Sequence, residues 1–317
     1  MVAFAHSVIG ASHIKNGQPC QDASLVRTIS GEKANEAYTF IAVADGHGDK
    51  PYFRSDIGSR FAVEAANECV TDSDVINALK ITKRDASIAR EKERDKIITQ
   101  LKRSIVGRWN ILVAEHAENN PFTKEELADV PEKYANEYRA GKSTETAYGT
   151  TLIAALLTDS FMLAMQIGDG NIVTVGAEGI FAQPVSLDEK CVLNITTSLC
   201  DKDAIGVFQH GFVDTPLAAV LIGTDGIDDC FAGAEKLFNF YRVVLTSFRD
   251  KDEETAKTEL IDYLPRLSEK GSGDDISIGV MIDMELLKTI NIETPNQEAE
   301  GGEADGGECD IGEVQRT

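Results

Sequence analysis

The residue most informative about chemistry is Asp45, in the segment AVADGHG at residues 42–48. An apolar run, residues 38–44, leads into it, and such a run followed by Asp-Gly predicts a buried strand that ends in a turn. The turn would hold a carboxylate, the open backbone carbonyl of Gly46 and the imidazole of His47 side by side. Oxygen ligands of this kind suit hard cations such as Mg²⁺ and Mn²⁺. Taken alone, the segment could be an ordinary Asp-Gly turn.

Three further aspartates stand beside strand-like runs. Asp169 and Asp225 each belong to an Asp-Gly pair at the end of such a run, and Asp274 comes just before one. Strand ends are rigid and exposed, so carboxylates from distant parts of the chain can converge there. A cluster of carboxylates would repel itself without a cation. The pattern therefore predicts a metal site built from strand ends.

Six short motifs follow one another in a fixed order over about residues 1–285. They are QDA at 21–23, DGHG at 45–48, GTT at 149–151, GDG at 168–170, TDGIDD at 224–229 and GDDIS at 273–277. In this order they resemble the motifs of the metal-dependent Ser/Thr protein phosphatases of the type 2C family. The opening, with GASH at 10–13 and PCQD at 19–22, is most similar to the stand-alone bacterial branch of that family.

The resemblance implies a phosphoprotein phosphatase that hydrolyses phosphoserine and phosphothreonine. It would do so by direct attack of a hydroxide that bridges two Mg²⁺ or Mn²⁺ ions, without a covalent enzyme intermediate. Asp45 would bridge both ions, the Gly46 carbonyl would bind one of them, and Asp225 with Asp274 would bind the other. Together with His47, these three aspartates form the expected catalytic set.

The resemblance also implies roles for residues around this set. Asp22 and Asp229 would act mainly through metal-bound waters. Asp169 would join Asp225 at a third, weaker metal site, or else it is a turn aspartate that caps its own backbone. His47 would be the general acid that protonates the leaving serine or threonine oxygen, or else a histidine that hydrogen-bonds a metal-binding carboxylate.

Two positions depart from the family pattern. Many members have Glu just before the first Asp, where this chain has Gln21, so one negative charge is missing near the second ion. Many members also carry a phosphate-binding Arg a few residues upstream, and residues 14–18 contain none. Lys15 or His13 could make that anion contact. The alternative is a solvated lysine and a buried histidine.

Three functions are compatible with these motifs. The leading one is a Mg²⁺- or Mn²⁺-dependent phosphoserine/phosphothreonine phosphatase. A catalytically dead relative that serves as a binding or scaffolding module would be favoured by the loss of a core ligand, but Asp45, Asp225 and Asp274 are all present. A third possibility keeps the metals and changes the substrate, to a small phosphoester or a phosphorylated regulatory partner.

Composition and charge limit the kinds of partner and the cellular location that we expect. The chain has 317 residues, 53 acidic against 31 basic ones, and a formal net charge of −22, which argues against nucleic-acid binding and against anionic membranes. Six scattered cysteines without a Cys-x-x-Cys pair indicate neither zinc nor disulfides. No signal peptide and no membrane-length apolar stretch is visible. We therefore expect a cytoplasmic protein, and a monomer. The resemblance implies that its partner is a phosphoprotein substrate of a Ser/Thr kinase pathway.

The apolar periodicity predicts both helices and strands. Helices are expected over about residues 53–71, 74–117, 233–247 and 253–269, and strands over the first forty-five residues and about 150–157, 160–167, 171–176, 217–223 and 275–283. Residues 184–216 are expected to be irregular with short strands. This order is not an alternating βαβ pattern, so it favours an α+β fold with antiparallel sheets covered by helices. The resemblance implies the same form: a β-sandwich flanked by helices on both faces, with the metal centre at one end.

The last part of the chain differs in character. Residues 289–317 hold eight acidic residues against one Arg, so this segment carries about −7. It offers too little apolar surface to offset the entropy of ordering. We therefore expect a phosphatase domain over residues 1–288 and an acidic, disordered tail over 289–317, either a solvated terminus or an autoinhibitory or solubilising segment.

Overall fold

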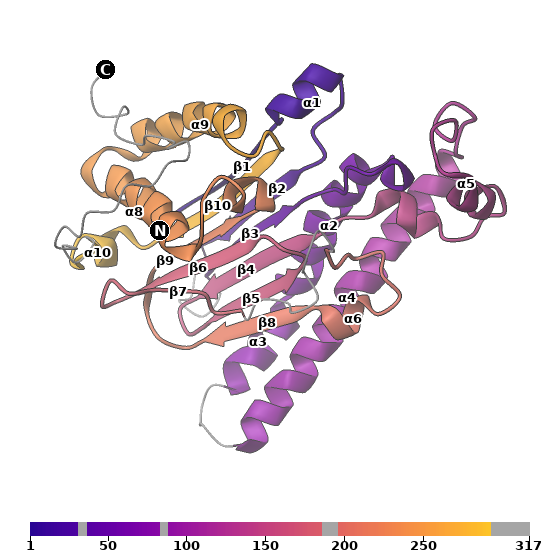
Figure 1. Cartoon of the computed structure of the whole chain (residues 1–317). Coiled ribbons are helices and arrows are strands. Elements are labelled where there is room, and N and C mark those ends of the chain that lie inside the picture. The colour runs from indigo at the N-terminus through magenta and orange to yellow at the C-terminus, as the bar shows by residue number, and fades with distance from the viewer. Residues whose placement is uncertain (31–36, 83–87, 186–195, 293–317) are drawn as a thin grey trace.

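Two antiparallel five-stranded sheets pack face to face in the protein (Figure 1). The structure, a computed structural model, describes residues 1–30, 37–82, 88–185 and 196–292. One sheet has the order β1 (Val2–Val8), β10 (Ile276–Ile282), β9 (Leu217–Gly223), β6 (Asn171–Gly176), β7 (Phe181–Ala182). The other has the order β2 (Ala23–Ile29), β3 (Tyr38–Ala44), β4 (Leu152–Thr158), β5 (Met162–Ile167), β8 (Gln209–Val213).

The strands are apolar on both faces, as β3 illustrates. Ile41 and Val43 point into the layer between the sheets, whereas Phe40 and Ala42 pack beneath helices. Successive side chains of a strand point to opposite faces, so a strand covered on both sides needs an unbroken apolar run. The runs that identified the strands in the sequence are therefore the signature of a covered sandwich.

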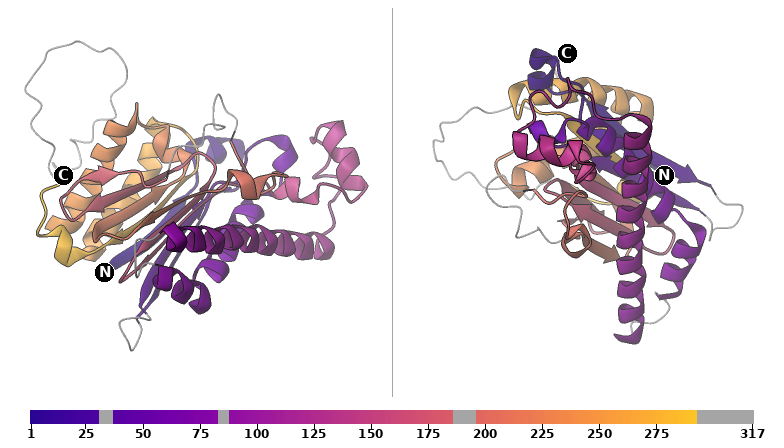
Figure 2. Two further views of the ribbon diagram at one scale, coloured as in Figure 1. Left: turned by 90° about the horizontal axis from the view of Figure 1, so that it is seen from below. Right: turned by 90° about the vertical axis from the view of Figure 1, so that its right-hand side faces the viewer.

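Helices cover the two outer faces. The helices α2 (Ser55–Val70), α3 (Ser73–Thr82) and α4 (Ile88–Asn119) pack on the β2-β3-β4-β5-β8 sheet. The helices α8 (Ala234–Asp250) and α9 (Glu253–Lys270) pack on the other sheet (Figures 1 and 2). The predicted α+β class, an antiparallel sandwich with helices on both faces, is confirmed. None of the helices in the described ranges is long and apolar enough to cross a bilayer.

One expected helix is two. The region 74–117 contains α3 and α4, with residues 83–87 outside the described part, and α4 continues to Asn119. The two helices bury separate stripes, which include Ile76 and Leu79 in α3 and Ile98 and Leu101 in α4. Because both stripes are apolar at helical spacing, the sequence did not reveal where one ends and the next begins.

Shorter helices complete the fold. They are α1 (Ala11–Asn16), α5 (Glu132–Arg139), α6 (Ala204–Val207), α7 (Asp225–Asp228), α10 (Met284–Leu287) and the 3₁₀ turns η2 (Lys50–Tyr52) and η3 (Thr144–Tyr148). The region 184–216, expected to be irregular, contains β8 at the sheet edge, as predicted, and α6, which was not predicted; residues 186–195 lie outside the described part.

The described chain ends in contact with the domain. Ile292 is 1% exposed, and its carbonyl oxygen accepts a hydrogen bond of 2.6 Å from Nε of Arg242 in α8. Packing therefore continues four residues past the boundary expected at residue 288. The acidic segment from residue 293 lies outside the described residues, and its separation from the domain stays a prediction.

Candidate metal centre

An acidic cavity lies at one end of the sandwich. Its volume is about 430 Å³, and it is lined by His13, Gln21, Asp45, Gly46, His47, Gly48, Asp49, Tyr52, Thr196, Asp225 and Asp274. Asp45 follows β3, Asp225 follows β9, and Asp274 stands just before β10. Since β3 belongs to one sheet and β9 and β10 to the other, the two sheets deliver their aspartates to a shared end, as predicted.

Three carboxylates meet at this end of the sandwich, two of them from residues that line the cavity. Asp45, Asp169 and Asp225 each place a ligand oxygen so that these atoms lie within 4.8 Å of one another. Oδ2 of Asp169 accepts a hydrogen bond from the Thr196 hydroxyl, whereas its Oδ1 is buried without a hydrogen-bond partner. A buried acceptor is normally satisfied, so this oxygen, on a carboxylate grouped with two others, fits a cation-binding role.

The backbone of Asp45 is held by the GTT motif. The hydroxyl of Thr150 and the backbone N–H of Thr151 both donate to the Asp45 carbonyl, at 2.7 and 2.8 Å. The Asp45 N–H donates in turn to Oγ1 of Thr151 at 2.9 Å. The backbone N–H and C=O of Asp45 are thus both engaged, which fixes the position of this residue. The sequence identified the motif but not this role.

Gly46 occupies a place that no other residue could take. A Cβ at this position would lie 2.6 Å from the Ser55 carbonyl oxygen and 2.7 Å from that of Gln21. The Gly46 N–H donates to the same Gln21 oxygen at 3.2 Å. The Gln21 side chain donates to the Ser55 hydroxyl at 2.8 Å, and its Oε1 is a second buried oxygen without a partner.

Asp22 joins the two sheets below the cavity. Its Oδ2 accepts a hydrogen bond of 2.9 Å from the hydroxyl of Thr224, and that hydroxyl accepts one of 2.9 Å from the N–H of Ser277. Burial, and then the charge of Asp275, raise the pKa of Asp22 well above its usual value. Thr224 was not predicted as a functional residue, although it lies in the TDGIDD motif.

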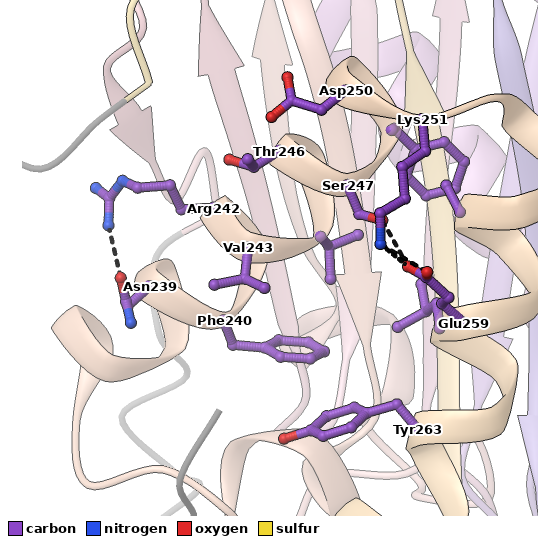
Figure 3. Close-up of a pocket in the computed structure, with 14 residues that line it drawn as sticks. Asn239, Phe240, Arg242, Val243, Thr246, Ser247, Asp250, Lys251, Glu259 and Tyr263 are labelled. Carbon is purple, nitrogen blue, oxygen red and sulfur yellow. Dashed lines mark hydrogen bonds and ion pairs between the residues drawn. The ribbon is translucent and has the colours of Figure 1, made fainter. Parts of the chain in front are cut away.

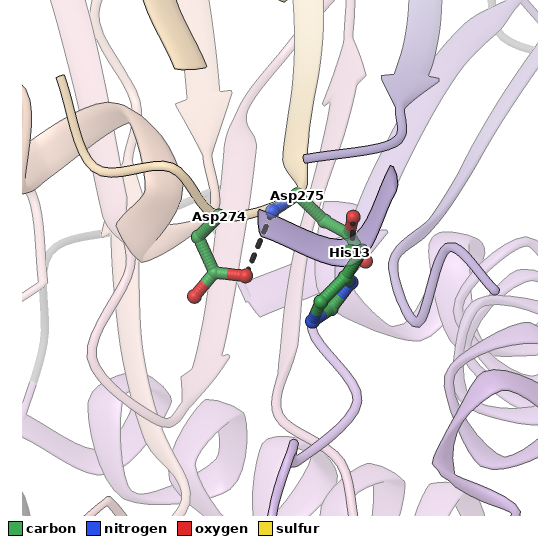
Figure 4. A group of neighbouring side chains, drawn as sticks. All are labelled: His13, Asp274 and Asp275. Carbon is green, nitrogen blue, oxygen red and sulfur yellow. Dashed lines mark hydrogen bonds and ion pairs between the residues drawn. The ribbon is translucent and has the colours of Figure 1, made fainter. Parts of the chain in front are cut away.

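Asp275 is a second site residue that the sequence did not single out. It is 2% exposed, and its two oxygens accept 2.6 Å hydrogen bonds from the N–H groups of Gly10 and Gln21. Its Oδ1 also lies 2.9 Å from Nδ1 of His13 (Figure 4). The neighbouring Asp274 is exposed and lines the cavity. Of these two adjacent aspartates, Asp275 is thus buried and holds backbone groups, whereas Asp274 is exposed to the cavity.

His47 lines the cavity from the loop after β3. Its backbone N–H donates to the Gly149 carbonyl at 3.1 Å. Its ring contacts the Tyr52 ring edge-on, with 4.8 Å between the ring centroids. Burial lowers the pKa of His47, although the nearby charges of Asp169 and Asp201 oppose that shift.

Of the remaining predicted residues, only His13 lines this cavity. Lys15 is exposed on α1 and is not among the lining residues. Asp229 is exposed at the end of α7, where its N–H donates to the Asp225 carbonyl at 2.8 Å. Burial, and then the charges of Asp169 and Asp274, raise the pKa of Asp229. The anion-contact hypothesis for His13 and Lys15 stays a prediction.

The carboxylates of the cavity are not balanced by positive side chains among its lining residues. Burial, with the charge of neighbouring carboxylates, raises the pKa of Asp225 to about 7, that of Asp228 to about 8 and that of Asp45 well above its usual value. The lining residues, which all belong to the described part of the chain, include no lysine or arginine. Divalent cations would supply the missing charge to this donor set.

These raised pKa values predict how the stability of the metal-free protein depends on pH. Below about pH 4 these carboxyls are protonated in both the folded and the unfolded state, so they do not lower the free energy of unfolding. As the pH rises, the unfolded chain ionises first, so folding stability falls until the folded-state pKa values, about 7 for Asp225 and about 8 for Asp228, are passed. One pKa unit corresponds to about 1.4 kcal/mol.

We therefore expect the melting temperature of metal-free protein to decrease as the pH is raised from about 6.5 to about 8.5. Most of this range lies above the titration of histidines with ordinary pKa values. Mn²⁺ should raise the melting temperature more at the upper end, because binding then requires no proton release. Asp225→Asn should flatten the metal-free profile. Scanning calorimetry in chelator measures both, and a wild-type profile that is flat or rises with pH would contradict this account.

A second cavity, also of about 430 Å³, lies between α8 and α9 (Figure 3). It shares no lining residue with the acidic cavity. Its carboxylates are paired: Glu259 accepts from Lys251 at 2.6 Å, and Asp250 accepts from Arg249 at 3.0 Å. It therefore offers no cluster of free ligands comparable to the metal centre.

Comparisons with known proteins bear on this geometry. A search of curated proteins finds no significant match. Among solved structures, a bacterial serine phosphatase shares 12% identity at a TM-score of 0.53, over 88% of this chain and 96% of that one. Stp1 from Staphylococcus aureus shares 13% at 0.54, over 89% and 95%. The catalytic domain of the phosphatase PstP, with two manganese ions, shares 16% at 0.51, over 88% and 96%; PstP occurs in Mycobacterium tuberculosis.

These structures share the fold of this chain. Its family membership is shown by the sequence. A family model described as "Protein phosphatase 2C" matches residues 9–265, which include five of the six motifs, from QDA to TDGIDD. The chain therefore belongs to the protein phosphatase 2C family of metal-dependent serine/threonine phosphatases.

Proposed function

We propose that this member of the family removes phosphate from phosphoserine and phosphothreonine in proteins, at the acidic cavity and with divalent cations. The observation that carries the proposal is the meeting of Asp45, Asp169 and Asp225, whose ligand oxygens lie within 4.8 Å of one another. Hard cations take carboxylate, carbonyl and water oxygens, which is the donor set present.

The proposed centre holds two ions, Mg²⁺ or Mn²⁺. Asp45 would bridge them, with the Gly46 carbonyl on one ion and Asp225 and Asp274 on the other. Asp169 would complete a third, weaker position beside Asp225. When bound, ions of this kind lower the pKa of water and neutralise phosphoryl oxygens. The two manganese ions in PstP support this number and this metal type.

The protein's own residues would prepare the site around those ions. The threonines of the GTT motif fix the Asp45 backbone, and Thr224 fixes Asp22. Fixed ligands cost no reorganisation when substrate binds, which is how a rigid acidic site favours catalysis. Asp22 and Asp229 would hold coordinated waters.

His47 is proposed to stand beside the leaving oxygen of the substrate. It lines the cavity next to Asp45, and its ring is held against Tyr52. From this place it can donate a proton to the departing serine or threonine oxygen, the general-acid role. Hydrogen bonding to a metal-binding carboxylate is the alternative role, and the two differ in how strongly they depend on the leaving group.

The substrate and setting follow from the same reasoning. A protein phosphatase acts on phosphoproteins, and we propose that the partner is a product of a Ser/Thr kinase in a signalling pathway. The scattered cysteines support a reducing cytoplasm, and the net charge of −22 argues against nucleic acid as a partner. We propose that the protein acts there as a monomer.

Hydrolysis of a phosphothreonine peptide tests the proposal. Metal-free protein should be inactive, addition of Mn²⁺ or Mg²⁺ should start release of phosphate, and excess EDTA should stop it. A phosphotyrosine peptide of the same sequence serves as the control and should be a poor substrate. Full turnover by metal-free protein in EDTA would overturn the metal-dependent mechanism, and metal binding without any hydrolysis would favour a binding module.

A further inference from the structure

His13 lies where a cation would be attracted and an anion repelled. It comes from α1, and Figure 4 shows it beside Asp274 and Asp275 at the start of β10. One ligand atom from each of these three residues lies within 4.8 Å of the others. Its side chain lines the acidic cavity together with Asp45 and Asp225. Two carboxylates thus stand beside the imidazole and two more line the same cavity, so before any ion is bound the surroundings of His13 favour a cation over a phosphate.

Asp275 has the features of a residue that orients a metal-binding histidine. Both of its oxygens are held by backbone N–H groups, so its position is fixed, and Oδ1 lies 2.9 Å from the buried Nδ1 of His13. This approach is a charge contact rather than an aligned hydrogen bond. Histidines that bind metals usually have the second ring nitrogen directed at a carboxylate. With Nδ1 directed at Asp275, Nε2 is the nitrogen left for a cation.

We propose that His13 is a nitrogen ligand to the cation held at Asp274, with Asp275 as its positioning residue. The inference rests on the proposed metal centre and goes beyond it, since that centre was built from oxygen ligands alone. Imidazole suits Mn²⁺ and the later transition metals better than Mg²⁺, which prefers oxygen. His13 would therefore shift the metal preference of this position away from Mg²⁺.

Pulsed electron paramagnetic resonance of the Mn²⁺-loaded protein tests the ligand directly. A ¹⁴N coupling to Mn²⁺ should be present in the wild type and absent in His13→Gln. Because His47 is the other histidine that lines the cavity, His47→Gln must retain the coupling. Lys15→Gln, on the same short helix but outside the cavity, is the matched control and should retain it as well. Melting temperatures confirm that each variant is folded.

Titration calorimetry gives a second readout. His13→Gln should weaken Mn²⁺ binding at one position by at least the roughly 10- to 100-fold typical of losing even an indirect partner, with little change for Mg²⁺. Asp275→Asn should weaken Mn²⁺ binding by a smaller factor and keep the ¹⁴N coupling.

Three outcomes overturn the inference while leaving the proposed function intact. The first is Mn²⁺-dependent hydrolysis with no ¹⁴N coupling in the wild type. The second is a coupling that survives in His13→Gln and disappears in His47→Gln. An unchanged Mn²⁺ affinity in His13→Gln, with weaker inhibition by inorganic phosphate, would assign His13 to anion binding instead and also overturn it. Failure of Mn²⁺ to bind or activate at all would instead overturn the proposed function.

Discussion

Replacing Asp45 by Asn should abolish phosphatase activity and at the same time make the metal-free protein more stable. Asp45 is the proposed bridge between two ions, and Asn offers a single neutral carbonyl oxygen in its place. Removing an indirect metal partner already costs roughly 10- to 100-fold, so loss of a bridging ligand should cost more than about 100-fold in Mn²⁺ affinity and in turnover.

The stability gain has a separate cause. Burial, and then the charge of Asp225, hold the pKa of Asp45 well above its usual value, so its ionised form strains the metal-free fold. Asp45→Asn removes that charge. Its melting temperature in chelator at pH 8 should therefore exceed that of the wild type, and Mn²⁺ should no longer raise it. This is the opposition between stability and function expected at an active site.

Calorimetry and thermal melts with and without Mn²⁺ measure both effects. Asp49→Asn is the matched control, because Asp49 is exposed, belongs to the same loop and is not a proposed ligand. It should bind Mn²⁺ and melt like the wild type. If Asp45→Asn binds Mn²⁺ and turns over normally, the assignment of the metal centre is wrong.

His47→Ala should slow the enzyme most on substrates whose leaving group needs a proton. A serine or threonine alkoxide leaves poorly unless it is protonated, whereas p-nitrophenolate leaves as a stable anion. General acid catalysis contributes typically about 10² to 10⁴-fold. We therefore expect a loss of that order on a phosphothreonine peptide and a much smaller loss on p-nitrophenyl phosphate.

The comparison requires that chemistry limits both reactions, which single-turnover kinetics can establish. Mn²⁺ affinity should be close to that of the wild type, because His47 is not a proposed ligand. Tyr52→Phe provides the control for the ring contact, since it keeps the edge-on partner of His47. Equal losses on the two substrates would place His47 among the residues that support the metal shell, and the general-acid role would then be withdrawn.

The sequence predicted much of the fold because its covered strands are continuous apolar runs. The runs before Asp45 and Asp225 marked both the strands and the turns that end them. The division of 74–117 into α3 and α4 was not predicted, because both helices carry apolar stripes of the same period. The class of fold, by contrast, followed from the order of elements, which is insensitive to such boundaries.

The site residues that could be predicted are those that stand next to a strand in the sequence, because the apolar run of the strand marks them. Asp275 was not singled out, because its role comes from backbone groups of Gly10 and Gln21, more than 250 positions away in sequence. The part played by Thr224 likewise depends on Asp22, 202 positions away. Contacts between distant segments leave no periodic trace in a single sequence.

The pairing of β1 with β10, the first and last strands in the described part of the chain, has a consequence for the order in which the enzyme is made. β1 lies at the edge of its sheet, and its ladder partner there is β10, with Val2 opposite Ile282. During synthesis β1 therefore emerges first and has to wait for almost the whole domain before its hydrogen bonds can form. Asp274 arrives at the same late moment. A growing chain should thus carry no phosphatase activity until its last strand has left the ribosome, so catalysis begins only once folding is complete.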